Sequence, residues 1–158
     1  MDKNEVMIQY LLQCPQIQAN PLFFNFLDAK DDNKQFLTAA NDKRLDQTFI
    51  DGSVLRRFTF TIVDYRSVAY QAVVKTAGYP NENVQEFLDI QAIVDWITEQ
   101  NDLRNFPDFG TGYQVEEMRS LTESPNLNGV DTNVSPALAK YSISIQIDYL
   151  DTTKRIWN

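Results

Sequence analysis

A segment late in the chain alternates without interruption between apolar and polar side chains. Its apolar positions are Tyr141, Ile143, Ile145, Ile147 and Tyr149. Because successive side chains of a β-strand point to opposite faces of a sheet, this period of two predicts a strand with one buried face and one solvated face. Sheets with one solvated face are typically antiparallel. The fold must therefore contain a sheet that is covered on one side.

A β-hairpin is predicted in the first half of the chain. Two extended segments, 43–50 and 53–65, lie on either side of Asp51 and Gly52. An Asp-Gly pair between two strand-like runs is a good local signal for a hairpin turn. Shorter strands are predicted at residues 22–27, 35–40 and 113–121.

Two helices are predicted from apolar positions that recur every three or four residues. The first covers residues 2–13 and is stopped by Pro15. The second covers about residues 82–100, with Asn81 as its N-cap. Its apolar stripe is expected to belong to the core and consists of Phe87, Ile90, Val94 and Ile97.

Strands that are grouped, rather than alternating with helices, indicate the α+β class. We expect a mainly antiparallel sheet covered by the long helix (about 82–100) and the short N-terminal helix, as one pair of layers. A length of 158 residues suits one domain, so residues 1–158 are expected to fold together. Long loops are expected at about 101–112 and 120–136, and the chain ends in a short C-terminal tail.

The absence of histidine removes several functional classes. Histidine titrates near neutrality and is the commonest metal ligand, and this chain has none. The single cysteine, Cys14, can form neither an internal disulfide nor a thiolate cluster. These counts exclude a Ser-His-Asp triad, a Cys-His pair and a histidine-bearing zinc site. The aspartates of residues 28–32 lack the ligand spacing of an EF-hand, so we predict no catalytic, cofactor-binding or metal-binding residue.

The net charge narrows the choice of partners. With 14 basic and 22 acidic residues the chain carries −8 at pH 7. A negative charge repels nucleic-acid phosphates, so the chain is not expected to be a nucleic-acid-binding clamp. The first residues lack the pattern of a signal peptide, and no apolar run reaches the roughly 18 residues of a membrane helix. We expect a protein that is made in the cytoplasm and does not contact a membrane.

Four apolar side chains in polar surroundings are candidates for a protein interface. Leu103, Phe106 and Phe109 lie in a predicted loop around Pro107, and Trp157 follows a basic pair near the end of the sequence. Exposed aromatic side chains of this kind are enriched where proteins meet. Local packing is the alternative for each of them.

Three segments carry a resemblance to a known family. They are VLRRFTFTIV at 54–63, NVQEFLDI at 83–90 and YSISIQIDYL at 141–150, and they follow an early helix. In this order the chain resembles the tail-terminator, or tail-completion, proteins of long-tailed bacteriophages, which are often labelled minor capsid proteins in prophages. The resemblance covers nearly the whole length and rests on patterns of strands and helices.

The resemblance implies a structural virion protein rather than an enzyme. Such proteins assemble as a hexameric ring on the head-proximal end of the tail tube, end its polymerisation and help to join the tail to the head. The implied partners are further copies of the chain, the tail-tube protein and a head–tail connector protein, in the tail or neck of the virion. DNA would only pass through the lumen, and an acidic ring suits passage because it repels phosphates.

A ring needs head-to-tail subunit contacts and separate surfaces for its other partners. We expect the segments 28–34, 101–112 and 120–136 to supply them. The polar candidates in the first and third of these segments are Asp31, Asp32, Asn126 and Asn128.

Three other functions remain open on the sequence. A neighbouring head-closure or neck connector protein would share these partners but bind the portal side. An acidic adaptor unrelated to phage would stay monomeric and would not bind tail-tube protein. A carboxylate- or metal-dependent hydrolase would be stabilised by a divalent cation.

Overall fold

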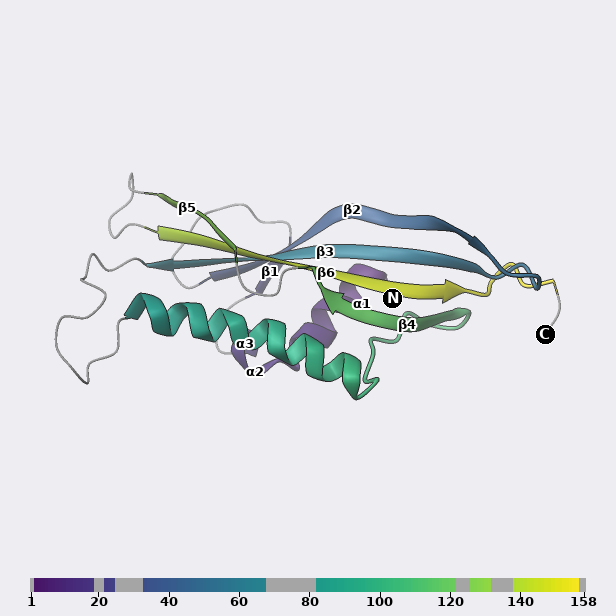
Figure 1. The fold of residues 1–158 in the computed structure, drawn as a ribbon, viewed down its shortest axis with the longest axis horizontal. Coiled ribbons are helices and arrows are strands. Elements are labelled where there is room, and N and C mark those ends of the chain that lie inside the picture. The colour runs from purple at the N-terminus through teal and green to yellow at the C-terminus, as the bar shows by residue number, and fades with distance from the viewer. Residues whose placement is uncertain are drawn as a thin grey trace.

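The protein is an α+β structure in two layers, a sheet and a set of helices that covers one of its faces (Figure 1). A computed structural model describes residues 2–18, 22–24, 33–67, 82–121, 126–131 and 138–156. Within these ranges the strands form one six-stranded sheet, and the predicted α+β class is confirmed.

The sheet is built around two long central strands. β3 (Val54–Ser67) and β6 (Leu138–Asp151) pair antiparallel along their whole length. β2 (Asn33–Thr48) pairs antiparallel with the other side of β3, and the short β1 (Leu22–Phe24) adds to β2 in parallel. The free side of β6 takes two further antiparallel strands, β4 (Tyr113–Ser120) and β5 (Asn126–Asp131).

The alternating segment from Tyr141 to Tyr149 lies at the centre of this sheet, as part of β6. Its five apolar side chains on β6 are all buried, and they face the helices together with buried side chains of β3. The β6 side chains Ser142, Ser144 and Asp148 are more accessible and lie on the opposite face. The predicted strand and its buried face are therefore confirmed, whereas the opposite face is only partly accessible, because Gln146 on that face is 5% exposed.

The helices begin and end close to the predicted positions. α1 (Lys3–Leu11) has Asp2 as its N-cap, with the Asp2 Oδ1 accepting a hydrogen bond from the Asn4 N–H at 3.3 Å. α3 (Glu82–Asp102) is the long helix, and its expected cap Asn81 lies outside the described residues. Pro15 begins a short α2 (Pro15–Gln18) that the sequence analysis did not anticipate, because proline is also well suited to the first position of a helix.

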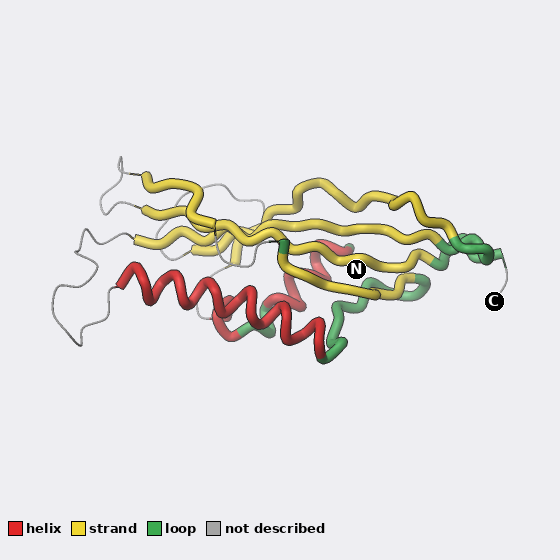
Figure 2. The backbone as a smooth tube through the Cα atoms, viewed as in Figure 1, coloured by secondary structure: helices red, strands yellow, loops and turns green. Residues whose placement is uncertain are grey.

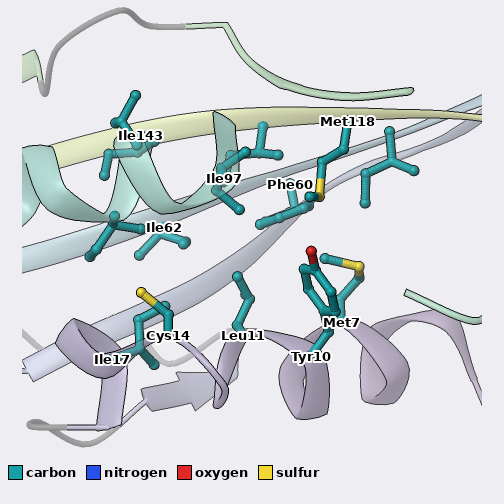
Figure 3. Packing of buried hydrophobic residues seen from close by; sticks show 14 of the residues in the cluster. Met7, Tyr10, Leu11, Cys14, Ile17, Phe60, Ile62, Ile97, Met118 and Ile143 are labelled. Carbon is teal, nitrogen blue, oxygen red and sulfur yellow. The ribbon is translucent and has the colours of Figure 1, made fainter. Parts of the chain in front are cut away.

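The core lies between the helices and one face of the sheet. Figure 3 shows Met7, Tyr10 and Leu11 of α1 opposite the sheet residues Phe60 and Met118. From α3, three predicted stripe residues are buried, namely Ile90, Val94 and Ile97. The Tyr10 and Trp96 rings, 5.3 Å apart between centroids, join α1 to α3 directly.

Two predictions about strands and loops need correction. Residues 35–40 are not a separate strand but part of the 16-residue β2. The prediction of a loop throughout residues 120–136 is wrong at β5, which pairs with the part of β6 that extends past β4. The unpaired edge of β6 offers backbone N–H and C=O groups, and pairing with them outweighs the low strand propensity of the asparagines and glycine in this segment.

The loop predicted at 101–112 begins at residue 103, because α3 continues to Asp102. Arg104, two residues after the end of α3, has the left-handed φ of 54° that is usually left to glycine. The Asn105 N–H donates to the Gln100 carbonyl at 3.0 Å and closes the last turn. Along the described ranges, no helix has the length and hydrophobicity needed to cross a bilayer.

Candidate protein-interaction site

The β2–β3 hairpin, with β6 beside it, extends beyond the helix layer as an arm (Figure 2). Its turn is a three-residue loop in which the Phe49 N–H donates to the Ser53 carbonyl and the Gly52 N–H donates to the Phe49 carbonyl. Gly52 has φ +89°, a conformation that glycine adopts without strain. The hairpin predicted from Asp51 and Gly52 is confirmed.

The C-terminal segment 152–156 is fastened to this turn. The Ile156 N–H donates to the Asp51 carbonyl at 2.6 Å, and the Arg155 guanidinium lies 2.7 Å from the Asp51 carboxylate. A Cβ at Gly52 would lie 2.7 Å from the Lys154 carbonyl oxygen, so only glycine allows the two segments to approach this closely. The end of the arm is therefore a fixed structure made from two distant parts of the chain.

This fixed structure presents apolar side chains to solvent. Ile50 is 89% exposed, Ile156 73% and Phe49 42%. Phe49, Ile50 and Leu150 also line an open cavity of about 430 Å³. We call Phe49, Ile50, Leu150 and Ile156 the arm tip. Burying an isoleucine side chain is worth about 1.5–3 kcal/mol, so a patch of this kind on an ordered surface indicates a site where another protein binds.

The fastening of the C-terminal segment is expected to weaken in acid. Hydrogen bonds from the Ser53 hydroxyl and N–H, and then the charge of Arg155, lower the pKa of the Asp51 carboxyl. A carboxyl with a lowered pKa in the folded state stabilises that state above its unfolded pKa, and this contribution is lost as pH falls through the folded pKa. In an NMR titration, the Ile156 amide should shift with a midpoint below the ordinary aspartate value of about 3.9.

Two variants control this titration. Asp51→Asn should abolish the shift of the Ile156 amide, whereas Asp46→Asn, which alters an exposed acid on β2, should leave it unchanged. A midpoint at or above about 3.9, or the same curve in Asp51→Asn, would contradict the role given to Asp51.

A polar cluster joins the arm to α1. The Asp42 carboxylate accepts hydrogen bonds from the Tyr149 hydroxyl and from the Arg56 Nε at 3.3 Å, and it lies 3.3 Å from the Lys3 ammonium. Burial, and then the hydrogen bond to Asp42, raises the pKa of the Tyr149 phenol, so it stays protonated. The Lys3 ammonium also lies 4.5 Å from the ring centroid of Tyr113. We call Asp42, Arg56, Tyr149 and Lys3 the Asp42 cluster.

A second surface feature lies between α1 and the loop that follows α3. It is a groove of about 340 Å³, and its two walls are linked where the Tyr10 hydroxyl donates to the Asn105 carbonyl at 2.7 Å. We call it the α1 groove. Its apolar lining comes from Val6, Tyr10, Phe106 and Pro107, and its polar lining from Gln9, Gln13, Asn105 and Asp108.

The outer face of α3 is acidic. The helix sequence contains six acidic residues and no basic one. Asp95, Glu99 and Asp102 are exposed at a spacing that puts them on one stripe. Like charges four residues apart destabilise a helix by a few tenths of a kcal/mol, and acids in the last turn oppose the helix dipole. The stripe is therefore a solvent-exposed, negatively charged face of the helix layer.

The predicted interface residues are distributed over different environments. Leu103 is 66% exposed just after α3. Phe106 lines the α1 groove, and the Arg104 guanidinium lies 5.5 Å from its ring centroid. Phe109 is only 5% exposed and packs on Phe58 and Tyr149, so local packing accounts for it. Asn126 and Asn128 belong to β5, not to a loop. Asp31, Asp32 and Trp157 lie outside the described residues.

The arm tip was missed by the sequence analysis, although a signal was present. Phe49 and Ile50 directly precede the Asp-Gly pair of a predicted turn, where an apolar side chain has no local core to enter. Ile156 could not be assigned to the same surface, because it is more than 100 residues away from Ile50 along the chain.

A scan of the chain against protein-family models and a search of curated proteins found no match. Within the described ranges, no group of three or more acidic or cysteine side chains is placed to hold a metal ion.

Proposed function

We propose that this protein is a structural component of a long-tailed phage that closes the head-proximal end of the tail tube. As a hexameric ring, the form that the resemblance implies, it stops tube polymerisation and presents a surface for joining the head. The proposal begins from the resemblance of segments 54–63, 83–90 and 141–150 to tail-terminator proteins, and these segments are β3, the first half of α3 and β6.

The observation that carries the proposal is the arm tip. A rigid arm that ends in exposed Ile50 and Ile156 is suited to contact another protein, and it lies apart from the helix layer. Proteins that assemble need such surfaces at separate places, because each subunit must contact its neighbours and a different partner at once.

The acidic stripe of α3 gives the proposal a second support. A ring that joins head to tail must let DNA pass without holding it. Exposed carboxylates such as Asp95 and Glu99 repel phosphates, so a lumen lined by them would have low affinity for DNA. A protein that captured DNA would need the opposite charge on this face.

The test is assembly with purified tail-tube protein. We expect the protein to shorten the tubes in proportion to its concentration and to occupy one tube end in electron micrographs. The Ile50→Asp variant is expected to lose capping while keeping the melting temperature of the wild type, because Ile50 is almost fully exposed and supports no core contact.

A matched control is Thr98→Asp, which adds the same charge at an exposed position on the outer face of α3, away from the arm tip. This variant should still cap tubes. Unchanged tube lengths with the wild-type protein would overturn the proposal. If the protein ignored tubes but bound an isolated connector ring, the neighbouring neck role would replace it.

A further inference from the structure

We propose that the arm tip of one copy inserts into the α1 groove of the next copy, so that identical subunits join head to tail. This inference rests on the proposed function, because it supplies the subunit contact that a ring requires. The occupant of the groove is thus a second copy of this chain.

The arm tip has the form of an inserting anchor. Ile50 lies in the turn, and Ile156 is held against the same turn by the hydrogen bond from its own N–H to the Asp51 carbonyl. Because hydrogen bonds and the Asp51–Arg155 ion pair already fix both segments, little conformational entropy is lost when they bind. Interfaces are commonly dominated by a few anchors of this kind that fill pockets.

The α1 groove has the form of a receptor for that anchor. Its volume of about 340 Å³ equals that of about ten water molecules in the liquid, which leaves room for an isoleucine side chain. Val6, Phe106 and the buried Pro107 supply apolar lining. The hydrogen bond between Tyr10 and Asn105 fixes the groove before any partner arrives.

The charges around the two surfaces are complementary. Along the arm and its fastened C-terminal segment, the exposed cations outnumber the exposed acids Asp42 and Asp46, and they are Lys43, Arg44, Lys154 and Arg155. Around the α1 groove the exposed acids outnumber the exposed Arg104, and they are Glu5, Asp102 and Asp108. Opposite charges at the rim favour the correct register and speed association, and they also disfavour contact between two arm tips.

The arm tip of one copy cannot enter the α1 groove of the same copy. The arm tip lies at the end of the long axis, beyond the helix layer, and the paired strands of the arm hold it there (Figure 1). The contact must therefore form between copies and involves two different surfaces. Contacts of this type form a closed ring when the rotation between neighbours closes.

Disulfide trapping tests the contact directly. Ile50→Cys and Gln13→Cys chains are mixed in equal amounts and oxidised, both alone and in the presence of tail-tube ends. Cys14 is fully buried, so the unmodified chain is the unreactive control. We expect at least tenfold more cross-linked dimer from this mixture than from Ile50→Cys mixed with Thr98→Cys, whose cysteine lies on the outer face of α3. The chain that carries both Ile50→Cys and Gln13→Cys should give a ladder that ends at the ring size.

Two outcomes overturn the contact: no excess over the Thr98→Cys control in either condition, or cross-links that join only two Ile50→Cys chains to each other. If the wild type caps tubes but the trap fails, this contact is wrong and the terminator role stands. If the trap succeeds but tubes are not capped, the self-contact stands and the terminator role fails.

Discussion

Replacing Phe60 with alanine is expected to lower the free energy of unfolding by about 3–5 kcal/mol. Phe60 is fully buried at the middle of β3, where its neighbours on β2 and β6 are Thr38 and Ile145. The substitution removes the ring and leaves a cavity that these paired strands cannot close. For a chain of this size, the melting temperature should fall by about 6–20 °C. Urea unfolding followed by circular dichroism measures the free energy, and calorimetry measures the temperature.

Thr61→Ala is the matched control for this prediction. Thr61 is the next residue on the same strand but lies on the solvated face, where its hydroxyl is 3.1 Å from the Ser144 hydroxyl. Loss of that hydrogen bond should cost only about 0.5–1.5 kcal/mol. Equal costs for Phe60→Ala and Thr61→Ala would mean that the two faces of β3 do not differ as described.

Replacing Tyr149 with alanine should be similarly severe, at about 3–5 kcal/mol of unfolding free energy. Tyr149 is fully buried at the end of β6, and its ring centroid lies 5.3 Å from that of Phe109 and 5.8 Å from that of Tyr113. Its hydroxyl also donates to Asp42 and accepts a hydrogen bond from the Arg56 Nε at 3.2 Å. The residue therefore combines core packing with the Asp42 cluster.

Tyr149→Phe separates these two contributions. It keeps the ring and removes the hydroxyl, so it should cost about 0.5–1.5 kcal/mol. A double-mutant cycle with Asp42→Ala should give a coupling energy of about 1 kcal/mol, because both variants remove the hydrogen bond from the Tyr149 hydroxyl to Asp42. A cost for Tyr149→Phe as large as that for Tyr149→Ala, or a coupling energy of zero, would contradict this division.

The Asp42 cluster also links the two surfaces that the proposed ring uses. Lys3 belongs to α1, which forms one wall of the α1 groove, whereas Asp42, Arg56 and Tyr149 belong to the strands of the arm. The cluster therefore fixes the groove relative to the arm tip. In a ring, the angle between these two surfaces on each subunit sets the number of copies that close it.

The long strands and helices were predictable because each follows from short-range patterns. The period of two from Tyr141 to Tyr149 defined β6, and the apolar stripe with Ile90, Val94 and Ile97 defined α3. The signal was strong since these segments bury one full face. β5 was not predictable, because its pairing depends on the extra length of β6 and not on its own asparagines and glycine.

The residues of the candidate site were harder to predict from the sequence than the helices and strands. Leu103 and Phe106 were expected to be surface candidates: Leu103 is exposed and Phe106 lines the α1 groove. Phe109, by contrast, turns into the core. Sequence spacing within an irregular loop does not fix the direction of a side chain, because no regular period relates one residue to the next.

The sequence by itself determined the α+β class, the hairpin at Asp51 and Gly52, and the acidity of α3, since these depend on local periodicity, turn chemistry and composition. Only the tertiary structure decided that Ile156 binds the turn at Asp51 and that Lys3 lies beside Asp42. Such contacts join residues distant in the chain, and they form because the sheet and the helix layer bring these segments together. The proposed interaction surfaces are made of contacts of this second kind.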